Sequence, residues 1–308
     1  ATAEEMAGVP ADVVEAARAA AERDGQDGHK ITLQFPSYFP VLQYGTHRPL
    51  RERLYTAYVT RASELGPVEL DNNPVMAELL KLRQEEATLL GYPHYAAVSL
   101  ASKMARSAEE VMAFLRDLSR RARGSAQKDL AELREFAARE LALADLQAWD
   151  IAFASEKLKE ARYAFSDQEV KAYFPLPKVL HGLFGIIETL FEVAIRPATA
   201  PVWTTGVRFY RIERAGELVG EFYLDPHARP GKRPGAWMDD ARERWLRPDS
   251  GRLQTPVAHL VCNFAAPLGE RPALLADRKD VEQSLRRMFV RPIAGVDHRA
   301  VQVVGQQV

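Results

Sequence analysis

The chain has 308 residues, of which 47% are hydrophobic and 27% are charged, and its formal net charge is −1. This length allows one large or two ordinary domains, and so balanced a charge gives no reason to expect a nucleic-acid or membrane partner. The apolar runs are shorter than the roughly 18 residues of a membrane span, and the single cysteine excludes an internal disulfide and a cysteine zinc site. A globular protein of the reducing cytoplasm is therefore expected.

The first hundred residues predict three helices and one short strand. The helices are expected over 10–24, 46–63 and 73–90, and the strand over 30–35. Gly25 and Gly91 follow the first and third helices as natural left-handed ends, and Thr46 is expected to cap the second. The strand is predicted from strict alternation of apolar and polar side chains.

The next ninety residues also predict helices. Ser107-x-x-Glu110 and Ser166-x-x-Glu169 are capping boxes, in which each side chain accepts a hydrogen bond from the other residue's free amide. Gly124-Ser125 is expected to interrupt the helix that begins at Ser107, and residues 149–164 continue as helix. The helix that begins at Pro177 has the clearest amphipathic pattern, with apolar residues at steps of three and four as far as Phe191.

After Pro197 the pattern changes to strands. Strands are predicted over 207–212, 217–224 and 257–264, the first two joined by a hairpin at 213–216, with 196–205 as a possible connector. The predicted fold class is therefore mainly α with a small β-sheet (α+β). The expected organisation is a helical body over 1–200, a small sheet with loops over 201–275, and a tail over 276–308.

The histidine spacing does not predict a zinc site. Such a site on one helix needs two imidazoles four residues apart, with a carboxylate beside them to act on the bound water. None of the seven histidines is followed by Glu, and no two are four residues apart. His227 and His259 lie on segments that could be neighbours, but neither has a local carboxylate. The sequence therefore predicts no catalytic and no metal-binding residue.

The segment 220–264 offers a few polar candidates, each with a structural alternative. The loop Gly231–Gly235 is basic but has no phosphate-binding fingerprint, and a solvated turn is the main alternative. Asp239 and Asp240 are adjacent and should point apart, so structural hydrogen bonding is the expected role, and Trp237 is interpreted as a packing anchor.

The strand over 257–264 has two distinct faces. Alternation places Ala258, Leu260, Cys262 and Phe264 toward a core, and Val257, His259, Val261 and Asn263 toward a partly wet surface. Cys262 is interpreted as a buried small hydrophobe, because no base nearby marks it as a nucleophile.

The segment that begins at Gly220 also carries a family resemblance. It reads GEFYLDPHARPGKRPGAWMDD, followed by VAHLVCNFAAP and then Pro272-Ala273-Leu274. This order closely resembles the oligopeptidase A and dipeptidyl carboxypeptidase branch of the thimet oligopeptidase family of zinc metallopeptidases. Similar stretches occur in order at 31–38, 58–63, 89–92, 99–105 and 149–157, so that the resemblance spans approximately residues 1–282.

The resemblance implies a partial zincin-like thimet oligopeptidase fold that admits short peptides to a deep channel with zinc at its floor. It also implies a cytoplasmic role in degrading short peptides. In such enzymes an edge strand beside the zinc helix pairs with the extended substrate. By resemblance, the strand over 257–264 is the candidate edge, with an ordinary sheet strand as the alternative. The implied peptide-binding residues are His259, Asn263, Ala265, Lys232 and Arg233, the last two because a cation in this loop could meet a substrate carboxylate.

The chain departs from the family where a His-Glu-x-x-His helix should follow residues 272–274. It continues instead as ADRKDVEQSLRRMF, and it does not begin with Met. We therefore expect a fragment of a zinc oligopeptidase, truncated or frame-disrupted, that is inactive as given and has no cofactor of its own, whereas intact family members hold zinc. One alternative is a non-catalytic helical protein that binds peptides or acts as a scaffold. Another is a split enzyme whose zinc ligands come from a separate chain.

Truncation also has a physical consequence. Apolar faces that pack against further helices in intact relatives should be exposed, and large exposed apolar patches promote association. Self-association is therefore expected, with short peptides as the other possible partner.

Overall fold

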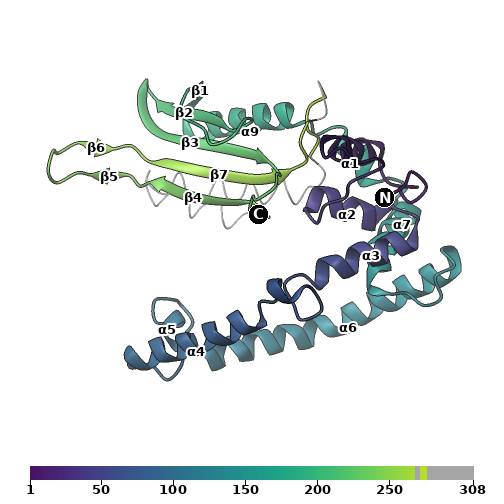
Figure 1. Cartoon of the computed structure of the whole chain (residues 1–308). Coiled ribbons are helices and arrows are strands. Elements are labelled where there is room, and N and C mark those ends of the chain that lie inside the picture. The colour runs from purple at the N-terminus through teal and green to yellow at the C-terminus, as the bar shows by residue number, and fades with distance from the viewer. Residues whose placement is uncertain (268–270, 276–308) are drawn as a thin grey trace. The chain divides into compact units, whose positions relative to one another are not determined.

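The computed structural model describes residues 1–267 and 271–275 (Figure 1). The chain forms two compact units: the first contains Ala1–Val41 and the described residues from Tyr163 onward, and the second contains Leu42–Arg162. The predicted division at residue 200 stays a prediction, and the predicted tail over 276–308 lies outside the described residues. No helix in the described part combines the length and apolar character that crossing a membrane requires.

Helices make up most of the chain before residue 192, as predicted. The first unit contains α1 (Ala11–Arg23), α8 (Asp167–Lys171) and α9 (Leu176–Phe191), and α2 (Phe35–Tyr44) begins in it. The second unit contains α3 (Arg48–Val59), α4 (Asn73–Leu89), α5 (Tyr95–Leu100), α6 (Ala108–Glu140) and all but the last residue of α7 (Ile151–Tyr163).

The strand predicted over 30–35 was wrong. Its backbone amides find local acceptors instead of a neighbouring strand: the Lys30 amide donates to the Ala17 carbonyl at 2.9 Å, and the Thr32 amide donates to Ser37 Oγ at 2.9 Å. Helix α2 then begins at Phe35. Alternation over six residues describes an extended segment but does not supply the partner that a strand needs.

The cap of α3 was also predicted at the wrong residue. His47, rather than Thr46, precedes the helix, and its Nδ1 accepts a hydrogen bond from the Leu50 amide at 3.2 Å. An imidazole nitrogen can therefore satisfy a free helix amide in place of the hydroxyl group that cap rules favour.

Helix α6 is continuous over 33 residues, so the interruption predicted at Gly124-Ser125 was wrong. Strong helix formers on both sides outweigh the roughly 1 kcal/mol that one interior glycine costs. The capping box at its start is half formed. Ser107 Oγ accepts from the Glu110 amide at 3.2 Å, but the Glu110 carboxylate accepts from the Arg106 amide at 2.8 Å.

The sheet of the first unit has the strand order β1-β2-β3-β7-β4. Its strands are β1 (Ala194–Ala198), β2 (Arg208–Arg214), β3 (Glu217–His227), β4 (Trp237–Arg242) and β7 (Val257–Phe264). β3 and β7 pair in parallel and all other neighbours are antiparallel. A separate two-stranded ribbon joins β5 (Trp245–Leu246) to β6 (Leu253–Gln254).

The three predicted strands are confirmed as β2, β3 and β7, but β1 and β4 were missed. The hairpin between β2 and β3 has a two-residue turn, Ala215-Gly216, with φ of +49° and +83°. Positive φ at both positions matches the twist of a tight antiparallel hairpin. The supposed connector over 196–205 contains most of β1, which its proline and arginine content concealed.

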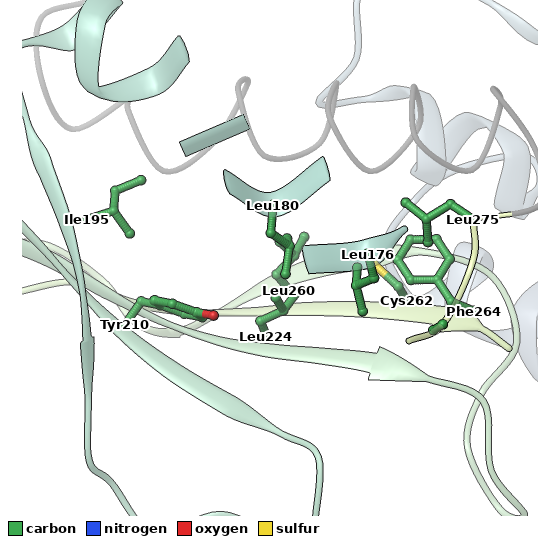
Figure 2. Packing of buried hydrophobic residues seen from close by; sticks show 10 residues of the cluster. Leu176, Leu180, Ile195, Tyr210, Leu224, Leu260, Cys262, Phe264 and Leu275 are labelled. Carbon is green, nitrogen blue, oxygen red and sulfur yellow. The ribbon is translucent and has the colours of Figure 1, made fainter. Parts of the chain in front are cut away.

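One face of the sheet packs under α9 and forms the main core (Figure 2). Leu176 and Leu180 of α9 lie over Leu224 of β3 and Leu260 of β7. Each such side chain stabilises the fold by about 1.5–3 kcal/mol when it is fully buried. The predicted core face of β7 is confirmed, because Ala258, Leu260, Cys262 and Phe264 are all buried.

The opposite face, which we call the outer face, is formed mainly by Phe209, Tyr223, Asp225, Trp237, Asp239, His259 and Val261. Val261 on this face was predicted to be partly exposed to water, but only 3% of its surface is exposed.

Of the two interpretations of the strand over 257–264, the sheet edge was wrong and the ordinary sheet strand is confirmed. β7 lies between β3 and β4, so β4 is the outer strand on this side of the described sheet (Figure 1). The physical reason is that the crossover between two parallel strands contributes β4. A polar segment such as Trp237–Arg242 does not look like a strand in the sequence because little of it is buried.

Candidate functional site

A row of four side chains crosses the outer face from strand to strand. Phe209 of β2 pairs with Tyr223 of β3, Tyr223 is in register with His259 of β7, and His259 is in register with Asp239 of β4. The Phe209 and Tyr223 ring centroids lie 4.6 Å apart, and those of Tyr223 and His259 lie 5.4 Å apart. Residues directly opposite in a sheet point to the same side. The row therefore presents an aromatic surface that ends in a carboxylate.

Trp203 lies against this row, ahead of β2 in the chain. Its ring centroid is 5.3 Å from that of Tyr223 and 5.3 Å from that of His259, and the indole and imidazole planes are nearly perpendicular, at 87°. The indole Nε1 donates to Asp225 Oδ2 at 3.1 Å. With half of its surface exposed, Trp203 gives the outer face an accessible aromatic ring.

Asp225 is the polar centre of the outer face and is only 3% exposed. Arg229 donates to both of its carboxylate oxygens, at 2.7 and 2.8 Å, and Lys232 Nζ donates to Oδ1 at 2.8 Å. Burial, the largest single influence, would raise the pKa of Asp225, but the hydrogen bonds from Arg229 and Lys232 outweigh it, so the pKa lies below its ordinary value. Asp225 is therefore an ionised, structural carboxylate.

Lys232, a predicted peptide-binding residue, is engaged with the protein. Besides Asp225 Oδ1, its Nζ donates to the carbonyl oxygens of Asp225 at 3.0 Å and His227 at 2.7 Å. Burial lowers the pKa of Lys232, against the opposing effect of Asp225. Its three ammonium donors thus have acceptors within the fold, and its contact with a peptide stays a prediction.

Asn263 and Arg233, two further predicted residues, are brought together in front of β4. The Asn263 side-chain amide donates to the carbonyl oxygens of Arg233 at 2.9 Å and Gly235 at 2.6 Å. Asn263 therefore fixes the path of the loop that leads into β4. The Arg233 side chain is exposed, so its guanidinium is accessible.

Ala265 and His259, the remaining predicted residues, lie elsewhere. The Ala265 carbonyl oxygen is 3.2 Å from His227 Nδ1, and burial lowers the pKa of this histidine. His259 belongs to the aromatic row. Peptide contact by either residue stays a prediction.

A groove of about 430 Å³ runs along the loop and the first half of β4, and it is lined by the consecutive residues Arg233–Asp239. Trp237 Nε1 is buried in its wall without a hydrogen-bond partner among the described residues. Asp239 and Asp240 are successive strand residues and so point to opposite sides of the sheet, as predicted. Structural hydrogen bonding was predicted for this pair, and one such bond is present: Asp239 Oδ1 accepts from the Asp240 amide at 3.0 Å.

Sequence reasoning missed the parts of the site that depend on register. It gave no role to Trp203, Tyr223 or Asp225. The usable signal was the spacing Asp225-Arg229-Lys232, in which two cations follow a carboxylate that closes an apolar strand.

The described donor set does not fit a zinc ion. His259 is in register with Tyr223, whereas His227 lies four residues farther along β3, so their positions are about 13 Å apart along the strands. His227 Nδ1 is taken up by Ala265, and His259 lies between aromatic rings. Among the residues that the structure describes, no three or more His, Cys, Asp or Glu side chains form a group that could hold a metal.

Comparison with known proteins gives a consistent family. The model of peptidase family M3 matches residues 41–283. Oligopeptidase A of Salmonella typhimurium is 46% identical over 88% of this chain and 40% of its own length. Oligopeptidase A of Haemophilus influenzae is 42% identical over 95% of this chain and 45% of its own length. Dipeptidyl carboxypeptidase of Escherichia coli is 32% identical over 86% of this chain and 38% of its own length. The chain thus spans less than half the length of these relatives.

Proposed function

The chain belongs to peptidase family M3, and from this premise we propose that it is part of a cytoplasmic zinc peptidase that hydrolyses short peptides. The observation that carries the proposal is the match over residues 41–283, together with 46% identity to an oligopeptidase A. The α+β arrangement of the described residues agrees with this assignment. A zincin-like thimet oligopeptidase fold is part of the same proposal.

We propose that this part of the protein binds the peptide backbone at β4. An outer strand presents unpaired amide and carbonyl groups to which an extended peptide can add as a further strand. The groove along Arg233–Asp239 supplies room beside that edge. β4 therefore replaces β7, which has neighbours on both sides, as the strand that we propose pairs with the substrate.

The same proposal assigns no hydrolytic step to these 308 residues. In the family the metal would activate water and polarise the scissile carbonyl. No His-Glu pair and no two histidines four residues apart occur in this sequence, and the described donors do not fit the ion. We expect the chain as given to bind short peptides without cleaving them, whether it is a fragment of an enzyme or a non-catalytic peptide-binding protein.

The test is zinc analysis combined with peptide binding and cleavage on the purified 308-residue chain. The expected result is zinc far below one ion per chain, a saturable rise in fluorescence anisotropy of a labelled capped octapeptide, and no cleavage by mass spectrometry. Stoichiometric zinc, with turnover that stops on chelation, would overturn the non-catalytic part of the proposal.

A backbone-modified peptide separates strand addition from other binding. N-methylation of alternate amides along one edge of the octapeptide removes donors without changing its side chains. Methylation of the edge that pairs should abolish binding, and methylation of the other edge should not. Equal binding by both methylated peptides would contradict pairing with β4.

A further inference from the structure

We propose that β4 selects peptides with a basic side chain and an apolar side chain two residues apart, recognised by Asp239 and Trp237. This inference rests on the proposed strand addition at β4 and names the class of peptide that the edge accepts. It is carried by the sheet register, by the charges along β4 and by the shape of the groove.

The register fixes where the side chains of an added strand would lie. Asp239 is in register with His259, and Trp237 is in register with Val261, so both point to the outer face. Met238 between them packs against the core on the other face. A peptide strand paired with β4 continues each row by one position, with its side chains about 4.5–5.5 Å from their neighbours on β4. One peptide side chain therefore lies beside Asp239, and the side chain two residues away lies beside Trp237.

The charges on β4 leave the Asp239 carboxylate available. It is exposed, and within the described part of the chain it forms no ion pair; its Oδ1 accepts a hydrogen bond from the neighbouring Asp240 amide. The nearest basic side chain on this strand, Arg242, is engaged elsewhere. Its Nε donates to the Thr255 carbonyl at 2.8 Å and its Nη2 donates to Glu221 at 3.4 Å. A lysine or arginine of the peptide would thus meet a carboxylate that is in no ion pair within the described part of the chain.

The surroundings of Asp239 favour a cation with an apolar stem. Its cross-strand neighbour His259 lies 5.3 Å from Trp203, ring centroid to ring centroid, so the row behind the carboxylate is aromatic. A lysine or arginine side chain can place its methylenes along such a surface and its charge at the carboxylate. The groove beside Trp237 takes the apolar partner.

The experiment measures the affinity of the 308-residue chain for four capped octapeptides of β-favouring residues. The first carries Lys and Phe two positions apart, the second has norleucine for Lys, the third has Glu for Lys, and the fourth has the same composition as the first with Lys and Phe adjacent. The first should bind about two- to fivefold more tightly than the second, as expected for an exposed cross-strand charge pair, and the third more weakly still. The fourth should lose the gain in affinity that the first shows over the second, because adjacent side chains point to opposite faces of the sheet.

Matched variants assign the effect to one carboxylate. Asp239→Asn should remove the preference for Lys over norleucine, and Asp239→Lys should reverse it in favour of Glu. Asp240→Asn removes the same charge one position along, on the other face, and should leave the preference unchanged.

Two results overturn the inference, and they differ in what else they affect. If all four peptides bind equally to the unmodified chain, or if Asp239→Asn and Asp240→Asn act alike, the selection by Asp239 is wrong and strand addition stands. If no peptide binds at any concentration, strand addition at β4 fails and the selection fails with it. The peptide series uses the unmodified chain, so equal binding of all four peptides, or no binding at all, is decisive without any variant.

Discussion

At the scale of single residues, Asp225 connects the end of β3 to the loop that leads to β4. Removing its charge leaves the Lys232 ammonium, whose side chain is only 4% exposed, without its anionic partner. Breaking a buried pair in this way costs about 3–5 kcal/mol. We therefore expect Asp225→Asn to lower the free energy of unfolding by about 3 kcal/mol in urea titrations. The exposed Asp249→Asn should change it by less than about 0.5 kcal/mol. Similar values for the two variants would show that the cluster contributes little.

The lowered pKa of Asp225 also fixes the sign of a pH dependence. Above the unfolded-state pKa of about 3.9, the carboxylate is ionised in both states and its stabilisation is fully present. The stabilisation is lost as the pH falls toward the lower pKa of the folded state. Urea unfolding between pH 3 and pH 6 should therefore show a steeper loss of stability on acidification in the unmodified chain than in Asp225→Asn. Parallel curves would contradict this assignment.

At the scale of elements, the uninterrupted α6 indicates that Gly124 is a weak point rather than a break. Apart from the nearby backbone of the helix itself, no heavy atom lies within 4 Å of the position that a Cβ would take there. Gly124→Ala should therefore raise the unfolding free energy by about 1 kcal/mol, because alanine is the better helix former. Gly91→Ala is the control, since Gly91 has φ of +77° and an alanine there is strained by roughly 1–2 kcal/mol. Thermal melts followed by circular dichroism distinguish the two, and a destabilising Gly124→Ala would count against the continuous helix.

Some of these helices and strands could be predicted from the sequence, and others could not. The spacing of α9 and the core face of β7 were predicted correctly, because burial on one side leaves a periodic apolar pattern. The other face of β7 was predicted less well, since Val261 is buried. β1 and β4 were missed because outer strands bury few side chains and so carry no such pattern. For the site, sequence reasoning named Asn263 and Arg233 separately but did not predict the hydrogen bond between them, and their role in peptide binding stays a prediction. The aromatic row was not predicted, because it depends on which strands become neighbours, and the sequence does not specify the order β3-β7-β4.

At the scale of the whole molecule, helices of the second unit expose many large apolar side chains. On α4 and α6 these include Leu79, Leu80, Leu82, Phe114, Leu115 and Leu118. We propose that these helices mediate self-association, because exposed apolar patches of this kind favour contact between copies.

Sedimentation velocity over a range of concentrations should show association that weakens in Leu80→Gln and Phe114→Gln. Leu246→Gln, an equally exposed leucine in the β5–β6 ribbon, is the control and should not change it. A monomer at every concentration would contradict the proposal.

The position of β4 has a consequence for how long any peptide-binding edge persists. Among the described strands this segment is hydrogen-bonded to β7 alone, while the other four remain bonded to one another without it. Its detachment is a local opening, which requires less free energy than global unfolding. A bound peptide would oppose that detachment, so occupancy by a ligand and attachment of the outermost strand would rise and fall together.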